Sequence, residues 1–165
     1  MIIGAMSQPS STAARVSGAL SPRGALRLDD WGVIRARGED AAAFLQGQLT
    51  NDVAALGTAE ARLAGYCSAK GRLLATFVVW RDAQGDFLLA CSADLLAPTL
   101  KRLSMFVLRA KCKLSDASAE VPLWGLAGDA VGSALGLPNR PWALAAVGGG
   151  QAIRLPDASV DGVAV

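Results

Sequence analysis

Apolar and polar residues alternate along several short stretches of this chain, which is the pattern of strands that bury one face. The alternation is clear where Val33, Arg35 and Arg37 are interleaved with Ile34 and Ala36. Similar stretches, bounded by Gly, Ser, Asp or Pro, recur along the sequence. The predicted strands are 25–28, 32–37, 63–67, 73–81, 87–91, 111–115, 121–127, 143–147 and 151–155.

A few helices are predicted between these strands. Apolar residues recur at helical spacing over 93–104, where Ser92 is the candidate N-cap. A helix is also predicted after Asp40, a second candidate cap, and it should end near Gly47; a short one is predicted over 129–135. Because strands and helices lack the regular alternation of a doubly wound fold, we predict an α+β fold with mixed, largely antiparallel sheets and packed helices.

The composition sets limits on what the chain can do. With 165 residues, 52% hydrophobic and 18% charged, it has enough apolar surface to form a core of about one domain. The net charge of +2 comes from 16 basic and 14 acidic residues without a basic run, so no nucleic-acid partner is predicted. Since no apolar run approaches the roughly 20 residues that a bilayer requires, no membrane partner is predicted either.

Histidine is absent and cysteine is sparse. Without His, imidazole-based acid–base catalysis is impossible and the common zinc and iron sites are disfavoured, so no metal ligand is predicted. The three cysteines, Cys67, Cys91 and Cys112, are odd in number and far apart. They are more typical of free thiols in a reducing compartment than of a disulfide framework.

The first residues differ in composition from the rest. They are rich in Ser and Ala, contain Arg15 and Arg23, and have no acidic residue before Asp29. We interpret 1–24 as a disordered tail of a bacterial cytoplasmic protein. A mitochondrial transit peptide, and therefore a location in the matrix, is the alternative.

Two polar segments are the best candidates for a binding site. Gln46, Gln48, Asn51 and Asp52 follow the first predicted helix, and their amides and carboxylate have the donors and acceptors that would bind the edge of a heterocycle. The alternative is that they only cap the end of a helix or strand.

The second polar segment is Lys70-Gly71-Arg72, in the turn between two predicted strands. Glycine lets backbone N–H groups approach a ligand and the two cations supply charge, so an anion site is possible. It is not a P-loop, because the other glycines and the following Ser or Thr are missing. The alternative is an ordinary turn with solvated side chains.

Taken together, four segments resemble the N-terminal part of the YgfZ family, and their order and spacing match from about Leu26 to Asp116. They are 28–31, 46–53, 68–72 and 101–103. YgfZ proteins bind folate, are similar to the glycine-cleavage T-protein (an aminomethyltransferase), and are implicated in iron–sulfur cluster assembly or repair.

The resemblance implies a fold, a ligand and partners. The fold is the N-terminal part of a T-protein-like folate-binding fold, and the ligand is tetrahydrofolate or a related folate. Gln48, Asn51 and Asp52 would lie near the pocket, and Lys70, Gly71 and Arg72 would shape its edge or meet the anionic tail of the ligand. The implied partners are iron–sulfur client or assembly proteins.

The sequence departs from these relatives in two ways. T-proteins have a pair of aspartates where Ala75 and Thr76 stand here, so a carboxylate to support a cationic folate intermediate is missing. The Lys-Gly-Cys motif found late in YgfZ proteins is also absent. We therefore expect 25–165 to be an incomplete aminomethyltransferase-like domain from the N-terminal part of a longer protein.

Three functions remain open at this stage. A folate-binding accessory or regulatory protein, with no catalytic residue, fits the missing aspartates best. The alternatives are a folate-dependent aminomethyltransferase of the T-protein class and a structural interaction domain whose polar loops only cap helices and strands.

Overall fold

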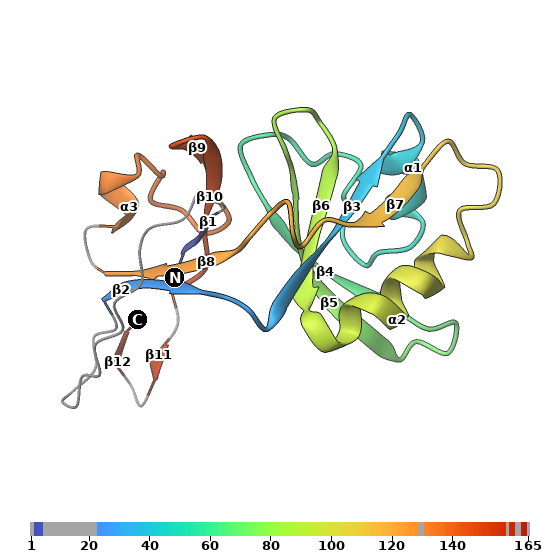
Figure 1. Cartoon of the computed structure of the whole chain (residues 1–165), viewed down its shortest axis with the longest axis horizontal. Helices are drawn as coiled ribbons and strands as arrows, with labels where there is room; N and C mark the ends of the chain where they lie inside the picture. Colours follow the sequence, from blue (N-terminus) through green and yellow to red (C-terminus); the bar gives the residue numbers. More distant parts are fainter. Residues whose placement is uncertain (1, 5–22, 129–130, 158, 161–162, 165) are drawn as a thin grey trace. The chain divides into compact units, whose positions relative to one another are not determined.

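The chain forms two compact units, described here from a computed structural model (Figure 1). The structure describes residues 2–4, 23–128, 131–157, 159–160 and 163–164. Unit 1 combines both ends of the chain, Met1–Leu28 and Pro122–Val165, and unit 2 is the continuous stretch Asp29–Val121. From the sequence, 25–165 was expected to form one domain, and this division was not predicted.

Unit 2 is built around a five-stranded antiparallel sheet with the strand order β4-β5-β6-β3-β7. Every one of these strands was predicted from the sequence to within two residues; the largest shift is at β7, which begins two residues later than expected. The strands are β3 (Trp31–Arg37), β4 (Arg62–Cys67), β5 (Leu73–Arg81), β6 (Phe87–Ser92) and β7 (Lys113–Asp116).

The core of unit 2 lies on one face of this sheet. Alternate residues of neighbouring strands, such as Phe77 on β5, Leu89 on β6 and Ile34 on β3, are fully buried in it. β6 is apolar on both faces, since Leu88 and Ala90 between its core residues are buried as well. This explains why its sequence is a continuous apolar run rather than an alternating one.

Two helices complete the core of unit 2. α1 (Ala41–Gln46) contributes Ala41 and Leu45, and α2 (Ala93–Ser104) packs against the sheet through Leu96 and Leu103. Both helices were predicted with these boundaries.

The predicted capping bonds at the starts of these helices are wrong. Asp40 and Ser92 do occupy the cap positions, but neither side chain bonds to its helix N-terminus. Asp40 accepts a hydrogen bond from the Lys111 N–H at 2.7 Å, and the Ser92 hydroxyl donates to Asp94.

Unit 1 contains a second antiparallel sheet, with the strand order β2-β8-β1-β10-β9. Its strands are β1 (Ile2–Gly4), β2 (Gly24–Arg27), β8 (Trp124–Ala127), β9 (Leu144–Val147) and β10 (Gly150–Arg154). The unit also contains the short helix α3 (Val131–Ala134) and a two-stranded pair, β11 (Ser159–Val160) and β12 (Val163–Ala164).

The predicted hairpin on three glycines is present in unit 1. β9 and β10 are joined by Gly148 and Gly149, both with positive φ. Two successive residues with positive φ form the tight turn that matches the twist of antiparallel strands. Glycine adopts this conformation without steric cost.

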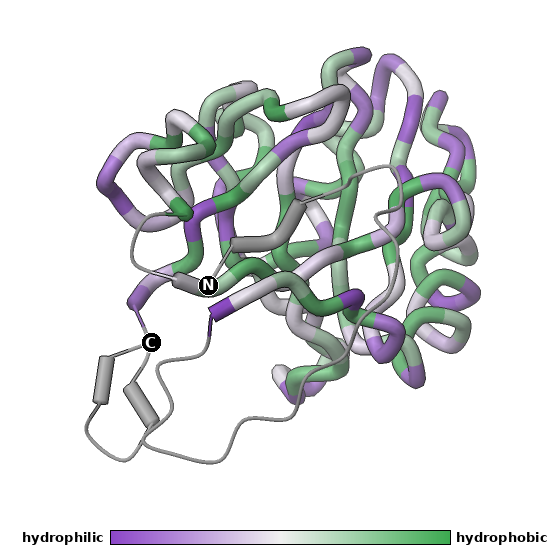
Figure 2. The backbone as a smooth tube through the Cα atoms, turned by 60° about the vertical axis from the view of Figure 1, so that its left-hand side comes forward, coloured by the Kyte–Doolittle hydropathy of each residue, from purple (hydrophilic) through white to green (hydrophobic). Residues whose placement is uncertain are grey.

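The predicted disordered tail is wrong at its start. Ile2–Gly4 form β1, which pairs with both β8 and β10. Residues 5–22 of the proposed tail lie outside the described residues. The remaining elements agree with an α+β fold with antiparallel sheets. Figure 2 shows hydrophobic and hydrophilic residues interspersed along the backbone.

Candidate functional site

Both polar segments predicted to bind a ligand lie in unit 2, next to strand β4. The first is the loop that follows α1, and the second is the turn between β4 and β5. β4 is an edge strand of the sheet, with β5 as its neighbour. The loop lies against the outer edge of β4, where Leu49 forms an isolated antiparallel bridge with Tyr66.

Several hydrogen bonds attach the loop to this edge, among them one from the Arg62 side chain to the Asp52 carbonyl. The Thr50 N–H donates to the Gly65 carbonyl at 2.9 Å, and the Gly65 N–H donates back to Thr50 Oγ1 at 2.8 Å. Asn51 Nδ2 donates to the Leu63 carbonyl at 2.9 Å. An open strand edge would otherwise expose these backbone groups for pairing with another chain.

Some of the predicted ligand-binding groups are used inside the loop. Asn51 Oδ1 accepts from the Asp52 N–H at 2.8 Å, and Asp52 Oδ1 accepts from the Ala55 N–H at 3.3 Å. Gln46 Oε1 accepts from the N–H groups of Val53 and Ala54, each at 2.9 Å. The capping alternative therefore describes Asn51 and Asp52, whose side chains brace their own backbone.

The Lys-Gly-Arg turn is closed by its own backbone. The Gly71 N–H donates to the Ser68 carbonyl at 2.9 Å, and the Arg72 N–H donates to Ser68 Oγ at 3.2 Å. Gly71 has a φ of 73°, a conformation that favours glycine. These two N–H groups therefore already have partners and are not available to an anion.

Three of the predicted side chains are free to meet a ligand. Among the described residues, Gln48, Lys70 and Arg72 make no side-chain hydrogen bond or ion pair, and the two cations are exposed. An amide and two unpaired cations suit a ligand that combines hydrogen-bonding edges with negative charge, such as a folate with its glutamate tail.

The structure shows where Ala75 and Thr76 lie, the two residues that stand in place of the T-protein aspartates. Ala75 pairs with Tyr66 and is buried in the core, whereas Thr76 pairs with Gly65 and is exposed. Neither side chain carries charge, so this part of β5 gives no electrostatic support to a cationic intermediate.

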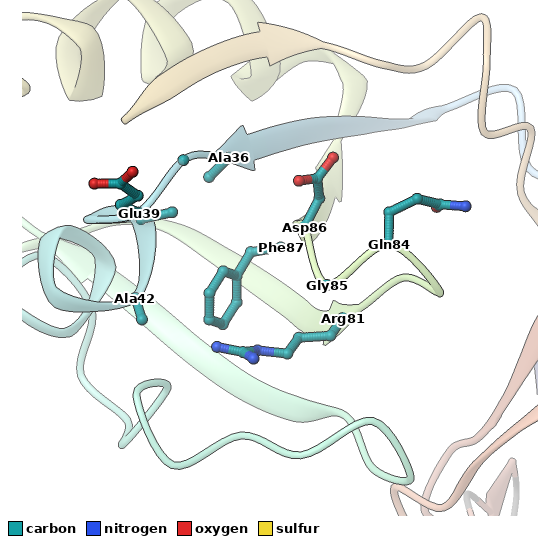
Figure 3. Close-up of a pocket in the computed structure, with 10 residues that line it drawn as sticks. Ala36, Glu39, Ala42, Arg81, Gln84, Gly85, Asp86 and Phe87 are labelled. Atoms are coloured by element: carbon teal, nitrogen blue, oxygen red, sulfur yellow. The ribbon is translucent and has the colours of Figure 1, made fainter. Parts of the chain in front are cut away.

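Sequence reasoning missed a hollow of about 340 Å³ elsewhere in unit 2. It lies between the start of α1 and the β5–β6 hairpin, and Figure 3 shows the Arg81 guanidinium beside the Phe87 ring. The guanidinium carbon is 4.4 Å from the ring centroid. The segment 82–86 was predicted only as a hairpin turn, and no periodicity in the sequence indicates that this turn lies near α1.

The charged groups of this hollow are already engaged. Asp86 accepts from Arg37 Nε at 2.7 Å, and this hydrogen bond and charge raise the pKa of Arg37. Glu39 pairs with Lys111, at 2.8 Å between Oε2 and Nζ. The hollow contains none of the six predicted site residues.

Two of the three thiols, those of Cys91 and Cys112, have raised pKa values. Burial raises the pKa of the Cys91 thiol to about 11, with smaller effects from Asp94 and Asp116. Burial also raises the pKa of Cys112, aided by Asp40. Both thiols therefore stay protonated near neutral pH, and a protonated thiol is a poor nucleophile.

Comparison with known proteins identifies relatives of this chain, although no protein-family model matches it. It is 38% identical over 120 residues to the tRNA-modifying protein YgfZ of Edwardsiella ictaluri, covering 70% of this chain and 35% of that protein. With YgfZ of Photobacterium profundum it shares 35% identity over 106 residues, covering 63% and 31%. The chain is a relative of the YgfZ proteins. It spans about a third of the length of these curated relatives.

The fold of this YgfZ relative is also found in a solved structure. Aminomethyltransferase T of the glycine cleavage system from Bartonella henselae superposes with a TM-score of 0.61 and 22% identity, covering 80% of this chain and 41% of that one. The predicted resemblance to YgfZ and the predicted T-protein-like fold are both confirmed. In the described part of the chain, no helix is long and apolar enough to cross a bilayer.

Proposed function

We propose that this chain is the folate-binding, N-terminal part of a YgfZ-like accessory or regulatory protein that supports iron–sulfur cluster assembly or repair. The observation that carries the proposal is the free amide of Gln48 and the free cations of Lys70 and Arg72, on two segments next to β4: the loop lies against its outer edge, and the turn follows its end. Tetrahydrofolate fits this donor set, because Lys70 and Arg72 complement the carboxylates of its tail and Gln48 complements its polar ring edge.

The proposed role is binding rather than catalysis. Asn51, Asp52 and Gly71 shape the site, since their hydrogen bonds fix the loop and the turn. The neutral Ala75 and Thr76 argue against the alternative of an aminomethyltransferase. An assay for methylene-tetrahydrofolate formation from an aminomethylated carrier protein is therefore expected to give no product.

The partners in this proposal are iron–sulfur client or assembly proteins in the bacterial cytoplasm, with the mitochondrial matrix as the alternative. The relatives are called tRNA-modifying proteins. We propose that any such effect acts through a client protein rather than through direct binding of tRNA. Part of the positive charge of unit 2 is already neutralised, because Arg35, Arg37, Arg62 and Lys111 each pair with a carboxylate.

Titration with tetrahydrofolate, followed by tryptophan fluorescence, tests the proposal. Wild-type protein is expected to show a saturable change. Replacing Lys70 and Arg72 together with Ala should weaken binding by about 10- to 100-fold, because a hydrogen bond to a charged group contributes roughly 1.5–3 kcal/mol.

A matched control variant has the same net charge as the variant that lacks Lys70 and Arg72. Lys101→Ala with Arg109→Ala also removes two exposed cations that have no partner among the described residues, and it should leave affinity unchanged. No saturable response from folded wild-type protein would overturn the folate proposal. Unchanged affinity in the Lys70 and Arg72 variant would favour the structural interaction domain instead.

A further inference from the structure

The loop after α1 and the side chain of Leu73, the first residue of β5, both lie close to a single residue, Gly65. This residue lies on the edge strand β4, and its partner on β5 is Thr76. Thr50 exchanges two hydrogen bonds with Gly65, one through its backbone N–H and one through its side-chain oxygen. The loop is thus attached to the strand at the position that faces the exposed Thr76.

Gly65 also provides the space for this contact. A Cβ atom at Gly65 would lie 3.1 Å from Thr50 Oγ1 and 3.0 Å from Leu73 Cδ1, both closer than ordinary van der Waals contact. Without that atom, Thr50 from the loop and Leu73 from the start of β5 both lie over the strand. Leu73 directly follows Arg72, so the loop and the end of the turn are adjacent at this residue.

Two neighbouring contacts also hold the loop against β4. Asn51 donates to the Leu63 carbonyl two residues before Gly65, and Leu49 bridges to Tyr66 one residue after it. Among these contacts, the hydrogen bond from the Gly65 N–H to Thr50 Oγ1 is made by a side chain of the loop. Its oxygen can be removed by substitution without altering the shape of the side chain. Thr50 was not among the predicted site residues.

We propose that Thr50 and Gly65 are positioning residues, which hold the loop carrying Gln48 against the strand that leads to Lys70 and Arg72. This inference rests on the proposed function, because it concerns the geometry of the proposed folate site. Neither residue needs to touch the ligand. They act by fixing the amide and the cations relative to one another before binding, so that less conformational entropy is lost when the ligand binds.

Thr50→Val is the principal test, measured by tetrahydrofolate titration of the full chain. The substitution keeps the side-chain shape and removes the acceptor of the Gly65 N–H. It is expected to weaken binding about three- to tenfold, the effect of one ordinary hydrogen bond. Thr50→Ser retains the hydroxyl and should keep the affinity of wild type within about twofold.

Two further readouts separate positioning from a merely structural role. In Thr50→Val the thermal midpoint should change little, while the amide of Gly65 exchanges with solvent faster. In addition, Thr50→Val and Lys70→Ala should be non-additive in binding free energy, because a displaced loop already weakens the contribution of the cation. Additive effects would contradict the proposed coupling of the two segments.

The outcomes distinguish this inference from the proposed function. If wild-type protein binds tetrahydrofolate and Thr50→Val binds equally well, the positioning role is overturned and the folate site stands. If wild-type protein does not bind, both are overturned. If Thr50→Val does not fold, Gly65→Ala decides the question, because it keeps every hydrogen-bonding group and displaces the side chains of Thr50 and Leu73. Unchanged affinity would then refute the positioning role.

Discussion

At the scale of single residues, the structure separates the predicted site into groups that brace the protein and groups that are free. Asn51 and Asp52 bond to neighbouring backbone, whereas Gln48, Lys70 and Arg72 make no side-chain bond among the described residues. The sequence alone could not make this distinction, because the same side chains serve caps and ligand sites equally well. Only the approach of a backbone partner decides which role each one has.

Gly71 offers a test at this scale. Its φ of 73° places it in the left-handed region, so Gly71→Ala should lower the free energy of unfolding by roughly 1–2 kcal/mol. Gly57→Ala is the matched control, because a Cβ at either position meets no atom within 4 Å and Gly57 has no positive φ. Urea denaturation should show Gly57→Ala unchanged or slightly more stable. Equal stability of the two variants would contradict the assigned turn.

At the scale of the helices and strands, local patterns were enough to locate most of them. The helix 93–104 and the strand 73–81 have the predicted boundaries, because each is long and periodic. The β5–β6 hairpin was recognised from its Asp and Gly residues, and the structure adds the mechanism. Asp82 Oδ1 accepts from the N–H groups of Gln84 and Asp86, each at 2.9 Å, while Gly85 takes the positive φ.

Asp82 therefore stabilises this hairpin through its side chain. Asp82→Ala leaves two backbone N–H groups without their acceptor and should cost about 1–3 kcal/mol in the free energy of unfolding, since Asp82 is buried. Asp82→Asn retains a carbonyl oxygen in the same place and should lose distinctly less. Chemical denaturation of the two variants is the measurement. A loss as large for Asn as for Ala would assign the effect to charge instead.

At the scale of the whole molecule, the main surprise is the division into two units. Strands β1 and β2 near the N-terminus pair with β8 and β10, which lie about a hundred residues away or more. Sequence periodicity identifies a strand but not its partner: β2 was predicted as a strand without its partner β8, and Ile2–Gly4 were assigned to a tail. Unit 2, a continuous segment, contains both polar segments of the proposed site.

If the ligand binds within unit 2, it should stabilise that unit against unfolding. Tetrahydrofolate at about 100 times its Kd should stabilise unit 2 by about 2.7 kcal/mol. For a unit of this size the thermal midpoint should rise by roughly 10 °C or more.

Fluorescence of Trp31 and Trp80 reports on unit 2 when the unit 1 residues Trp124 and Trp142 are replaced with Phe. Phosphate buffer at the same ionic strength is the control for a general salt effect. An unshifted unit 2 transition at saturating ligand would place the binding site elsewhere.

The sequence by itself determined the positions of most strands, helices and turns, the α+β class, and the neutral residues Ala75 and Thr76 where a catalytic carboxylate would stand. These features depend on periodicity, turn chemistry and residue type, which are local properties. The tertiary structure decided which strands pair, which polar groups are already bonded, and that Thr50 meets Gly65 across a strand edge. Those outcomes depend on residues far apart in the chain approaching within hydrogen-bonding distance, and a glycine inside a strand pattern was the one local hint of such a contact.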